Sequence, residues 1–596
     1  MGVIAGAVPL DPAVTEGRTG LDTRSADGRW LIAWSGRLDN RAAVARQFAR
    51  SPADGDAQLA AEAIATGGII ALGAAIGDFA VVAWDLAERC LWLARDAIGF
   101  RPLFYLHALD HVWFSNEMRW LTNGPARGRA INEGHIAELL AGVVVNVAET
   151  RTEGVQRVLP ATALGFEFGK SAPKQVTLWR PPTGLPTRRS DAALIEEFRE
   201  RFTTAVARSI GSDERVSTQL SGGLDSTSVT GVVSALSGRA PDAYSLVYPS
   251  LPTARDGEML DESPFIDAAV AAIGCRSVRI EPLGRDALER SDFLRVMTAH
   301  GEIPDFPVTD ALNYALFARA AADGHRVMLT GLGGDYWLTG STSRLPALIR
   351  RGRWLAAWRF HRDARRNDTI EATTEQIRAH LAARLAPRWA KSLYRRWYSP
   401  RVWPAWLPDQ FTRRVHLGAR MRRLSARVPE VDDDVLQDSL MMLTLAGPLL
   451  ARESVFRAAA DAGAASGAGF DVRHPMLDRE FVEFVMTLPD DLRLRGQESR
   501  FILRRALGDV LPPMIRDRRS KGDATTLVGV AISQLLAGRS SIDGYASARG
   551  WIDPARLWPR LQPLSLANAR DRVPAEGDDH LWAAVAVETW LAERGA

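Results

Sequence analysis

The stretch Gln219-Leu220-Ser221-Gly222-Gly223-Leu224-Asp225-Ser226-Thr227 follows an apolar run at 216–220 and opens a helical segment. Two adjacent glycines let the backbone approach an anion closely, and the N-terminus of a helix favours negative charge. The hydroxyl groups of the stretch add hydrogen-bond donors. A glycine turn with a capping serine would explain a lone Ser-Gly-Gly, but the full pattern after a strand is more specific and predicts a phosphate-binding loop.

One acidic residue, Asp225, stands inside this stretch. A carboxylate repels phosphate, so Asp225 cannot bind it directly, but a carboxylate beside phosphates suits a bridging Mg²⁺ ion. The stretch also lacks the Gly-Lys-Ser/Thr ending of a Walker loop. Cleavage of a bound nucleotide therefore need not occur at the γ-phosphate.

The segments around the loop have the pattern of a parallel α/β sheet. Apolar strands at 216–220, 243–247 and 327–330 alternate with helical segments rich in Ala and Leu. Ligands of such sheets bind at the carboxyl ends of the strands. A strongly periodic helix is expected at 191–210, and the Pro- and Gly-rich segment 181–189 predicts a domain boundary near residue 185.

The first 125 residues predict a sheet domain with some helix. Short apolar runs separated by Gly, Asp and Asn turns lie at 30–34, 79–84, 91–94 and 112–114. From about residue 345 the pattern is mainly helical. We expect two domains, at 1–185 and 186–596, with a basic helical region at 345–430.

Composition narrows the class of protein. A chain of 596 residues, 46% hydrophobic and 24% charged, is a folded protein with more than one core. Its two cysteines, Cys90 and Cys275, form neither a disulfide framework nor a zinc motif, so a reducing compartment fits best. No apolar run approaches the roughly 18 residues of a membrane span, and no signal peptide is recognisable. A cytoplasmic protein without membrane contact is expected.

The positive charge is concentrated in one segment. Residues 341–430 hold twenty arginines and one lysine against six acidic residues, together with six tryptophans. Such a mixture suits a nucleic-acid surface or an acidic peptide or partner protein, and it equally suits helices with buried tryptophans and solvated arginines. We expect no nucleic-acid partner.

Three further motifs follow the first loop in order. They are Thr330-Gly331-Leu332-Gly333-Gly334-Asp335, Arg473-His474-Pro475-Met476-Leu477-Asp478 and Arg518-Arg519-Ser520-Lys521-Gly522. The first loop resembles the pyrophosphate loop of the ATP-pyrophosphatase superfamily, which cleaves ATP between the α and β phosphates. The later motifs resemble the second nucleotide loop, the RxPxLD element and the late lysine segment of asparagine synthetases.

This resemblance implies ATP and Mg²⁺ as cofactors and assigns roles to particular residues. Lys521 would stabilise charge on the departing pyrophosphate, although a surface lysine is the simpler alternative. Glu453 would be the general base toward the amine, although a helix-face salt bridge to Arg457 explains it equally well. The resemblance places pyrophosphate on Ser221, Gly222, Gly223, Ser226 and Thr227, Mg²⁺ on Asp225 and Asp335, and adenosine on Leu220, Leu246 and Gly331.

The N-terminal part is similar to the glutaminase domain of asparagine synthetases, an Ntn-type α+β sandwich. The similarity lies at 77–80, 93–96, 101–103 and 114–117. Gly2 stands where that family has its catalytic cysteine, and Ser35-Gly36 replaces the Asn-Gly pair of its oxyanion hole. Glycine cannot supply a thiolate, and neither cysteine is placed to substitute. The domain is therefore expected to lack glutaminase activity and to act as a scaffold or docking surface.

The residue at 332 separates the branches of the family. Asparagine synthetases carry Glu and β-lactam synthetases Tyr where this chain has Leu332, which cannot relay a proton. Together with the cysteine-less first domain and the basic aromatic region, this favours a resemblance to lasso peptide cyclases. That resemblance implies a ribosomal precursor or core peptide as substrate, with a leader-binding protein and a leader peptidase as partners. A small-molecule amide ligase and a non-catalytic nucleotide-binding scaffold are the alternatives.

Overall fold

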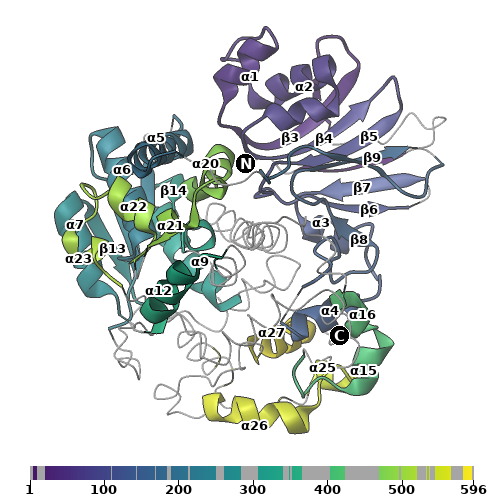
Figure 1. Ribbon diagram of the computed structural model, residues 1–596. Coiled ribbons are helices and arrows are strands. Elements are labelled where there is room, and N and C mark those ends of the chain that lie inside the picture. Colours follow the sequence, from purple (N-terminus) through teal and green to yellow (C-terminus); the bar gives the residue numbers. More distant parts are fainter. Residues whose placement is uncertain are drawn as a thin grey trace.

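We analysed a computed structural model of the chain. The residues that it describes are 4–9, 21–108, 110–142, 144–167, 169–183, 189–212, 215–249, 261–282, 307–339, 348, 352–365, 403–422, 469–495, 498–519, 532, 536, 542, 544–565 and 581–593. Figure 1 shows the N-terminal sheets beside a second α/β unit, with C-terminal helices below both.

The N-terminal part is a sandwich of two antiparallel sheets (Figure 1). One sheet has the order β1 (Ala5–Pro9), β7 (His111–Ser115), β6 (Phe104–His107), β8 (Val155–Arg157). The other has the order β10 (Lys174–Thr177), β9 (Thr162–Glu167), β5 (Cys90–Arg95), β4 (Gly77–Asp85), β3 (Trp30–Leu38), β2 (Thr23–Arg24). The strands expected from the four apolar runs are confirmed as β3, β4, β5 and β7.

Strand β4 is buried on both faces because the sandwich has a third layer. Its Val82 and Trp84 pack toward the other sheet, while Phe79 and Val81 pack toward two helices. This is the alternation of period two that a strand requires. The helices are α1 (Arg41–Gln47) and α2 (Asp56–Gly67), and the layer also holds the 3₁₀ helix η1 (Ile69–Ala74), while α3 (Met118–Asn123) packs against β6 and β7.

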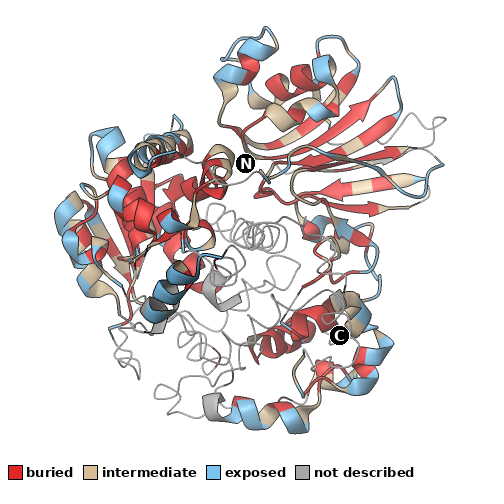
Figure 2. Ribbon diagram, in the orientation of Figure 1, coloured by how far each residue is buried: buried red, intermediate tan, exposed pale blue. Residues whose placement is uncertain are grey.

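The second unit is built on a parallel five-stranded sheet, as predicted. Its order is β13 (Arg276–Ile280), β12 (Asp242–Leu246), β11 (Val216–Gln219), β14 (Val327–Leu329), β15 (Asp471–Arg473). Tyr244 and Met328 face one side, and Ala243, Val327 and Leu329 face the other. Both faces are buried, which explains the continuous apolar runs in the sequence (Figure 2).

Helices cover the two faces of this sheet. The expected helix at 191–210 is α5 (Asp191–Ile210), whose N-cap Ser190 accepts a hydrogen bond from the Ala193 N–H and whose Phe198 and Phe202 are fully buried. One face contacts α9 (Pro307–Ala322). The other core includes α5, α6 (Leu224–Ser237), α7 (Ser263–Ile273), α20 (Arg479–Met486), α22 (Phe501–Ala506) and α23 (Pro513–Arg516). The α/β fold expected for both parts is confirmed.

A third set of helices joins distant parts of the sequence. Helix α4 (Glu133–Leu140) packs on α16 (Leu417–Arg422) and α27 (Leu581–Glu593) in one apolar core. Buried Glu138 forms an ion pair with Arg420, with 2.6 Å between Oε1 and Nε. The same core includes α15 (Asp409–Arg414), α25 (Tyr545–Ala548) and α26 (Pro554–Ser565). Residues from the first expected domain thus share a core with the C-terminal helices.

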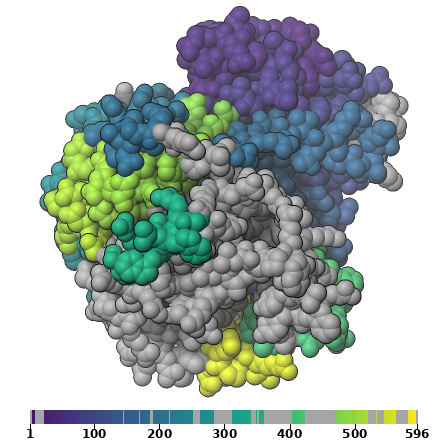
Figure 3. Space-filling view, viewed as in Figure 1, coloured from purple at the N-terminus to yellow at the C-terminus, as the bar shows by residue number. Residues whose placement is uncertain are grey.

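In the basic helical region, some of the described tryptophans are buried and others are exposed. Trp406 is fully buried, whereas Trp354 and Trp358 on α12 (Trp354–Arg365) are 65% and 58% exposed. Figure 3 shows α12 at the molecular surface. The tryptophans are therefore neither all core nor all surface. The described helices include no candidate membrane span.

Candidate nucleotide-binding site

Two glycine-rich loops begin side by side at the carboxyl ends of adjacent strands. Strands β11 and β14 are parallel neighbours, with Thr218 opposite Leu329. The first loop runs from β11 into α6, and the second runs from β14 into α10 (Gly334–Trp337). This is the edge at which parallel α/β sheets bind ligands.

The two loops pack directly on each other because glycines lie at their contact. A Cβ atom on Gly331 would lie 2.5 Å from the backbone N of Ser226. A Cβ on Gly334 would overlap the Asp225 carboxylate. In the first loop, Gly222 has φ +77°, and a Cβ there would lie 2.8 Å from Cβ of Phe265. A larger residue at Gly331 would push the two loops apart, whereas one at Gly334 would displace the Asp225 carboxylate.

Hydroxyl groups shape the first loop from inside. The Ser221 N–H donates to Oγ of Ser226 at 3.1 Å, and the two serine hydroxyls are 3.0 Å apart. Ser221 is exposed, while Gly223 is half-buried and is the N-cap of α6. Thr227 is fully buried. The assignment of all five loop residues to pyrophosphate stays a prediction.

The residues expected to contact adenosine lie along the same sheet edge. Leu220 is fully buried, and its carbonyl accepts a hydrogen bond from the Ser245 hydroxyl at 2.6 Å. Leu246 is the last residue of β12 and is half-buried. With Gly331 beside the first loop, these residues lie at the carboxyl ends of three neighbouring strands, β12, β11 and β14.

The two acidic residues expected to bind Mg²⁺ converge on one cation. The Arg500 guanidinium forms an ion pair with Asp225, 3.0 Å from Nε to Oδ1, and a second with Asp335. Burial acts to lower the pKa of Arg500, but the charges of Asp225 and Asp335 raise it above its usual value. One or two carboxylates beside phosphates is the usual Mg²⁺ arrangement. Asp225 and Asp335 therefore fit the expected ion.

The RxPxLD element holds the second loop. The Thr330 hydroxyl and Nδ1 of His474 are hydrogen-bonded at 2.6 Å, and the Thr330 N–H donates to the Arg473 carbonyl at 3.0 Å. The His474 ring also packs on Phe100 of the N-terminal part, with centroids 4.9 Å apart. The element thus connects the second loop to the N-terminal domain.

The segment that leads to Lys521 lies beside the first loop. Arg518 forms an ion pair with Glu262 at 2.5 Å, and its guanidinium stacks 3.8 Å from the ring centroid of Phe265. Phe265 is the residue that contacts Gly222. Lys521 and Glu453 themselves lie outside the described residues, so their roles stay predictions.

A cluster of ion pairs connects β15, the edge strand of the parallel sheet, to the N-terminal domain. Asp471 of β15 contacts Arg101 at 2.8 Å, Arg473 at 2.9 Å and Arg37 at 3.7 Å. Burial acts to raise the pKa of Asp471, but the three guanidinium groups hold it well below its usual value. A small cavity next to Arg37, lined also by Asp96 and His474, has a volume of about 20 Å³, which is room for about one water molecule.

Asn116 connects Ile4, the first described residue, to Ser35 in the N-terminal domain. The Ile4 N–H donates to Oδ1 of Asn116 at 3.0 Å, and the Asn116 amide donates to the Ser35 hydroxyl at 3.2 Å. Gly2 lies outside the described residues. Cys90 is buried in β5 and Cys275 is buried in the second unit, so neither is a substitute nucleophile at Ser35.

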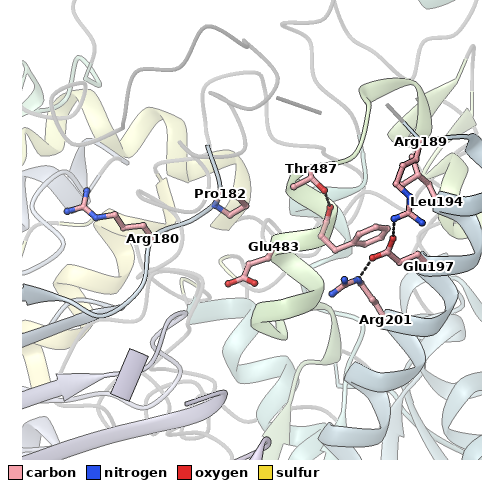
Figure 4. Close-up of a pocket in the computed structure, with 9 residues that line it drawn as sticks. Arg180, Pro182, Arg189, Leu194, Glu197, Arg201, Glu483 and Thr487 are labelled. Atoms are coloured by element: carbon pink, nitrogen blue, oxygen red, sulfur yellow. Dashed lines mark hydrogen bonds and ion pairs between the residues drawn. The ribbon is translucent and has the colours of Figure 1, made fainter. Parts of the chain in front are cut away.

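A separate hollow lies away from the loops. It has a volume of about 420 Å³ and is lined by Arg180, Pro182 and Arg189 and by residues of α5 and α20 (Figure 4). Glu197 is held there between Arg189 and Arg201. Glu197 thus pairs with two arginines of the same hollow, and none of the lining residues belongs to the two loops.

Comparison with known proteins identifies the family. Residues 197–592 match the asparagine synthase family, and residues 17–177 match the glutamine amidotransferase domain. The first match covers most of the chain. This chain belongs to the asparagine synthase family.

Several curated proteins of this family are similar to the chain. Asparagine synthetase [glutamine-hydrolyzing] 3 of Bacillus subtilis is 24% identical over 465 residues, covering 74% of this chain and 66% of that protein. A putative asparagine synthetase of Mycobacterium tuberculosis is 24% identical, covering 75% and 66%. The chain thus spans about two thirds of the length of these relatives.

Among solved structures, a glutamine phosphoribosylpyrophosphate amidotransferase of B. subtilis covers 52% of this chain and 57% of that chain. It is 14% identical with a TM-score of 0.18, which is too low to show a shared fold.

Membership of the asparagine synthase family agrees with the expected enzyme class, an ATP-dependent carbon–nitrogen ligase that forms AMP.

The sequence motifs do not predict Arg500, which pairs with both acidic residues of the candidate site. Arg500 is 165 residues from Asp335 along the chain and belongs to none of the four motifs. Its backbone has φ 54°, a left-handed conformation that arginine rarely adopts. No spacing or periodicity around it gives a signal.

We expect Gly334→Ala to lower nucleotide-dependent pyrophosphate release about 10- to 100-fold, because the new methyl group displaces the Asp225 carboxylate. The thermal unfolding temperature should change little, since a side chain can move aside. Gly55→Ala is the control, because a Cβ there meets no atom within 4 Å. Full activity of Gly334→Ala would show that the loops do not pack as described.

We expect neither thiol to react with iodoacetamide at pH 8 in the folded protein. Burial raises the pKa of Cys90 to about 12 and also raises that of Cys275, so little thiolate forms. Mass spectrometry should find no label in the native protein and two labels after denaturation. Rapid native labelling of Cys90 would contradict its burial.

Proposed function

We propose that the chain is an AMP-forming ligase that closes a macrolactam in a ribosomal lasso peptide. An Asp or Glu side-chain carboxylate of the peptide attacks the α-phosphorus of ATP, and pyrophosphate leaves. The peptide's own N-terminal amine then attacks the acyl carbon, and AMP leaves. A general base takes the amine proton.

The observation that carries the ligase part is the convergence of two loops on one cation site. Asp225 and Asp335 lie in the first turns of α6 and α10, the helices that follow the adjacent parallel strands β11 and β14, and both pair with the same guanidinium. A bound Mg²⁺ would neutralise charge on the phosphates. The loop backbone and α6 would then hold the pyrophosphate at a helix N-terminus, while Asp225 and Asp335 hold the ion.

The residues of the N-terminal domain favour a nucleophilic amine that does not come from glutamine. By the resemblance to the family's glutaminase domain, Ser35 would stand where the family has the asparagine of its oxyanion hole. Among the described residues, the ion pairs of Asp471 with Arg101 and Arg37 connect the two domains.

The second loop favours a substrate that differs from those of asparagine synthetases and β-lactam synthetases. Leu332 is half-buried and packs on the apolar core of the sheet, so it supplies no proton acceptor. The exposed aromatic and basic residues of α12, with Arg362 stacked 5.0 Å from the Trp358 ring centroid, offer contacts for a peptide. A leader-binding protein and a leader peptidase would deliver this peptide with a free N-terminus.

The proposal is tested with the core peptide encoded beside the gene of this chain. We expect incubation with Mg–ATP to remove one water from the peptide mass, and the product to resist exopeptidases. Lys521→Ala should abolish this change. No change in peptide mass, together with pyrophosphate release stimulated by aspartate or a small β-amino acid, would overturn the peptide assignment.

The similarity to asparagine synthetases favours a second candidate. The relatives that the chain resembles carry that name, at 24% identity. A small-molecule amide ligase would use the same adenylation step with free ammonia or an internal amine. Aspartate-stimulated pyrophosphate release in the absence of peptide distinguishes this candidate from the peptide ligase.

A further inference from the structure

Arg500 occupies the space between the two carboxylates of the candidate metal site. Its side chain is 10% exposed, and its guanidinium pairs with Asp225 of the first loop and Asp335 of the second. Asp225 is 14% exposed, but Asp335 is 47% exposed. The contact with Asp335 therefore lies at the open edge, and the contact with Asp225 lies deeper.

The backbone at Arg500 is held in an unfavourable conformation. Its φ of 54° is left-handed, which costs of order 1 kcal/mol for a residue with a side chain. The Arg500 N–H donates to the Leu338 carbonyl at 3.1 Å, and the next residue, Phe501, is buried in the core. Strain of this kind persists where the surrounding structure over-determines it, and it concentrates at functional sites.

Electrostatics makes this guanidinium and a divalent ion competitors. Two carboxylates that face each other repel unless a cation lies between them. The Arg500 guanidinium lies in this position, paired with both carboxylates. A divalent ion bound by the same two carboxylates would repel the guanidinium, whereas the phosphate oxygens that arrive with it would attract it.

We propose that Arg500 is a positioning residue that holds Asp225 and Asp335 together before Mg–ATP binds. The divalent cation displaces its guanidinium from Asp335 at the open edge of the site. The released guanidinium pairs with phosphate oxygens of the nucleotide. This inference rests on the proposed ATP site and adds a resident counter-ion to it.

The test is Mn²⁺ binding to the nucleotide-free protein, measured by electron paramagnetic resonance of the free ion. We expect Arg500→Gln to bind Mn²⁺ about tenfold more tightly than wild type, because the competing charge is gone. Arg500→Gln/Asp335→Asn should lose this gain. A purely structural role would not tighten metal binding. Equal or weaker Mn²⁺ binding by folded Arg500→Gln would overturn the inference.

A second variant keeps the test decisive if Arg500→Gln does not fold. Arg500→Lys keeps the charge but has one compact ammonium group, which cannot bridge both carboxylates. We expect its Mn²⁺ affinity to lie above that of wild type, and no change would overturn the inference.

The readout is also independent of the proposed reaction. Tighter Mn²⁺ binding without pyrophosphate release by wild type would keep the role of Arg500 and reject the ligase. Pyrophosphate release by wild type, with no change of Mn²⁺ binding in Arg500→Gln, would support the ligase and reject the role of Arg500.

Discussion

Asp225→Asn should lower the rate of pyrophosphate release by about 10²- to 10³-fold. Asparagine keeps the size of the side chain but removes the charge that holds a cation against the phosphates. Asp225 is the more buried of the two acidic residues that pair with Arg500, so an ion from solvent does not replace its charge. The rate is measured with purified enzyme, saturating Mg–ATP and the carboxylate substrate.

Asp242→Asn is the matched control for Asp225→Asn. Asp242 begins β12 at the opposite end of the same sheet, is 19% exposed, and pairs with Arg276 at 2.7 Å. The two acids therefore have similar burial and each has an arginine partner. Asp242→Asn should retain most of the activity. Equal losses in the two variants would show that the effect reports on folding rather than on the site.

Asp471→Ala should lower the free energy of unfolding by about 3–5 kcal/mol, because three buried or partly buried guanidinium groups lose their shared partner. Arg101 is only 4% exposed, so its charge has no access to water in the folded protein. We expect urea denaturation followed by tryptophan fluorescence to show the loss. The N-terminal domain should also become more sensitive to proteolysis.

Asp509→Ala controls for the loss of an ordinary ion pair. Asp509 pairs with Arg199 at 2.6 Å, but the two side chains are 59% and 49% exposed. Exposed pairs contribute about 0–1 kcal/mol. A similar loss in both variants would contradict the importance of the interdomain cluster.

The effect of Asp471→Ala also has a defined dependence on pH. The pKa of Asp471 is lower in the folded chain than its usual value, so its stabilisation is present above that usual value. It is lost as pH falls toward the folded pKa. The difference between Asp471→Ala and wild type should therefore be constant near neutral pH and shrink only in strong acid.

The local parts of the site could be predicted from sequence because their signals are local. The first loop combines a strand, two glycines and a helix start within nine residues. The second loop repeats this order, and the alternation of strands and helices predicts that both loops lie at one sheet edge. The structure places them on adjacent strands, β11 and β14.

Contacts between distant segments could not be predicted in this way. The apolar face of α4 predicts burial, but not that its partners are α16 and α27, far along the chain. Asp471 lies two residues before the RxPxLD element, yet its three arginines come from both domains. Arg500 reaches the site through a backbone conformation that its residue type disfavours.

Identification of the nucleotide product tests the central claim most directly. The chain is incubated with Mg–ATP and the core peptide, and the products are separated by ion-exchange chromatography, with Asp225→Asn as the inactive control. A site built from these two loops predicts AMP and pyrophosphate in equal amounts, formed only when the carboxylate substrate is present. Formation of ADP and phosphate, or no consumption of ATP with either the peptide or aspartate, would contradict it.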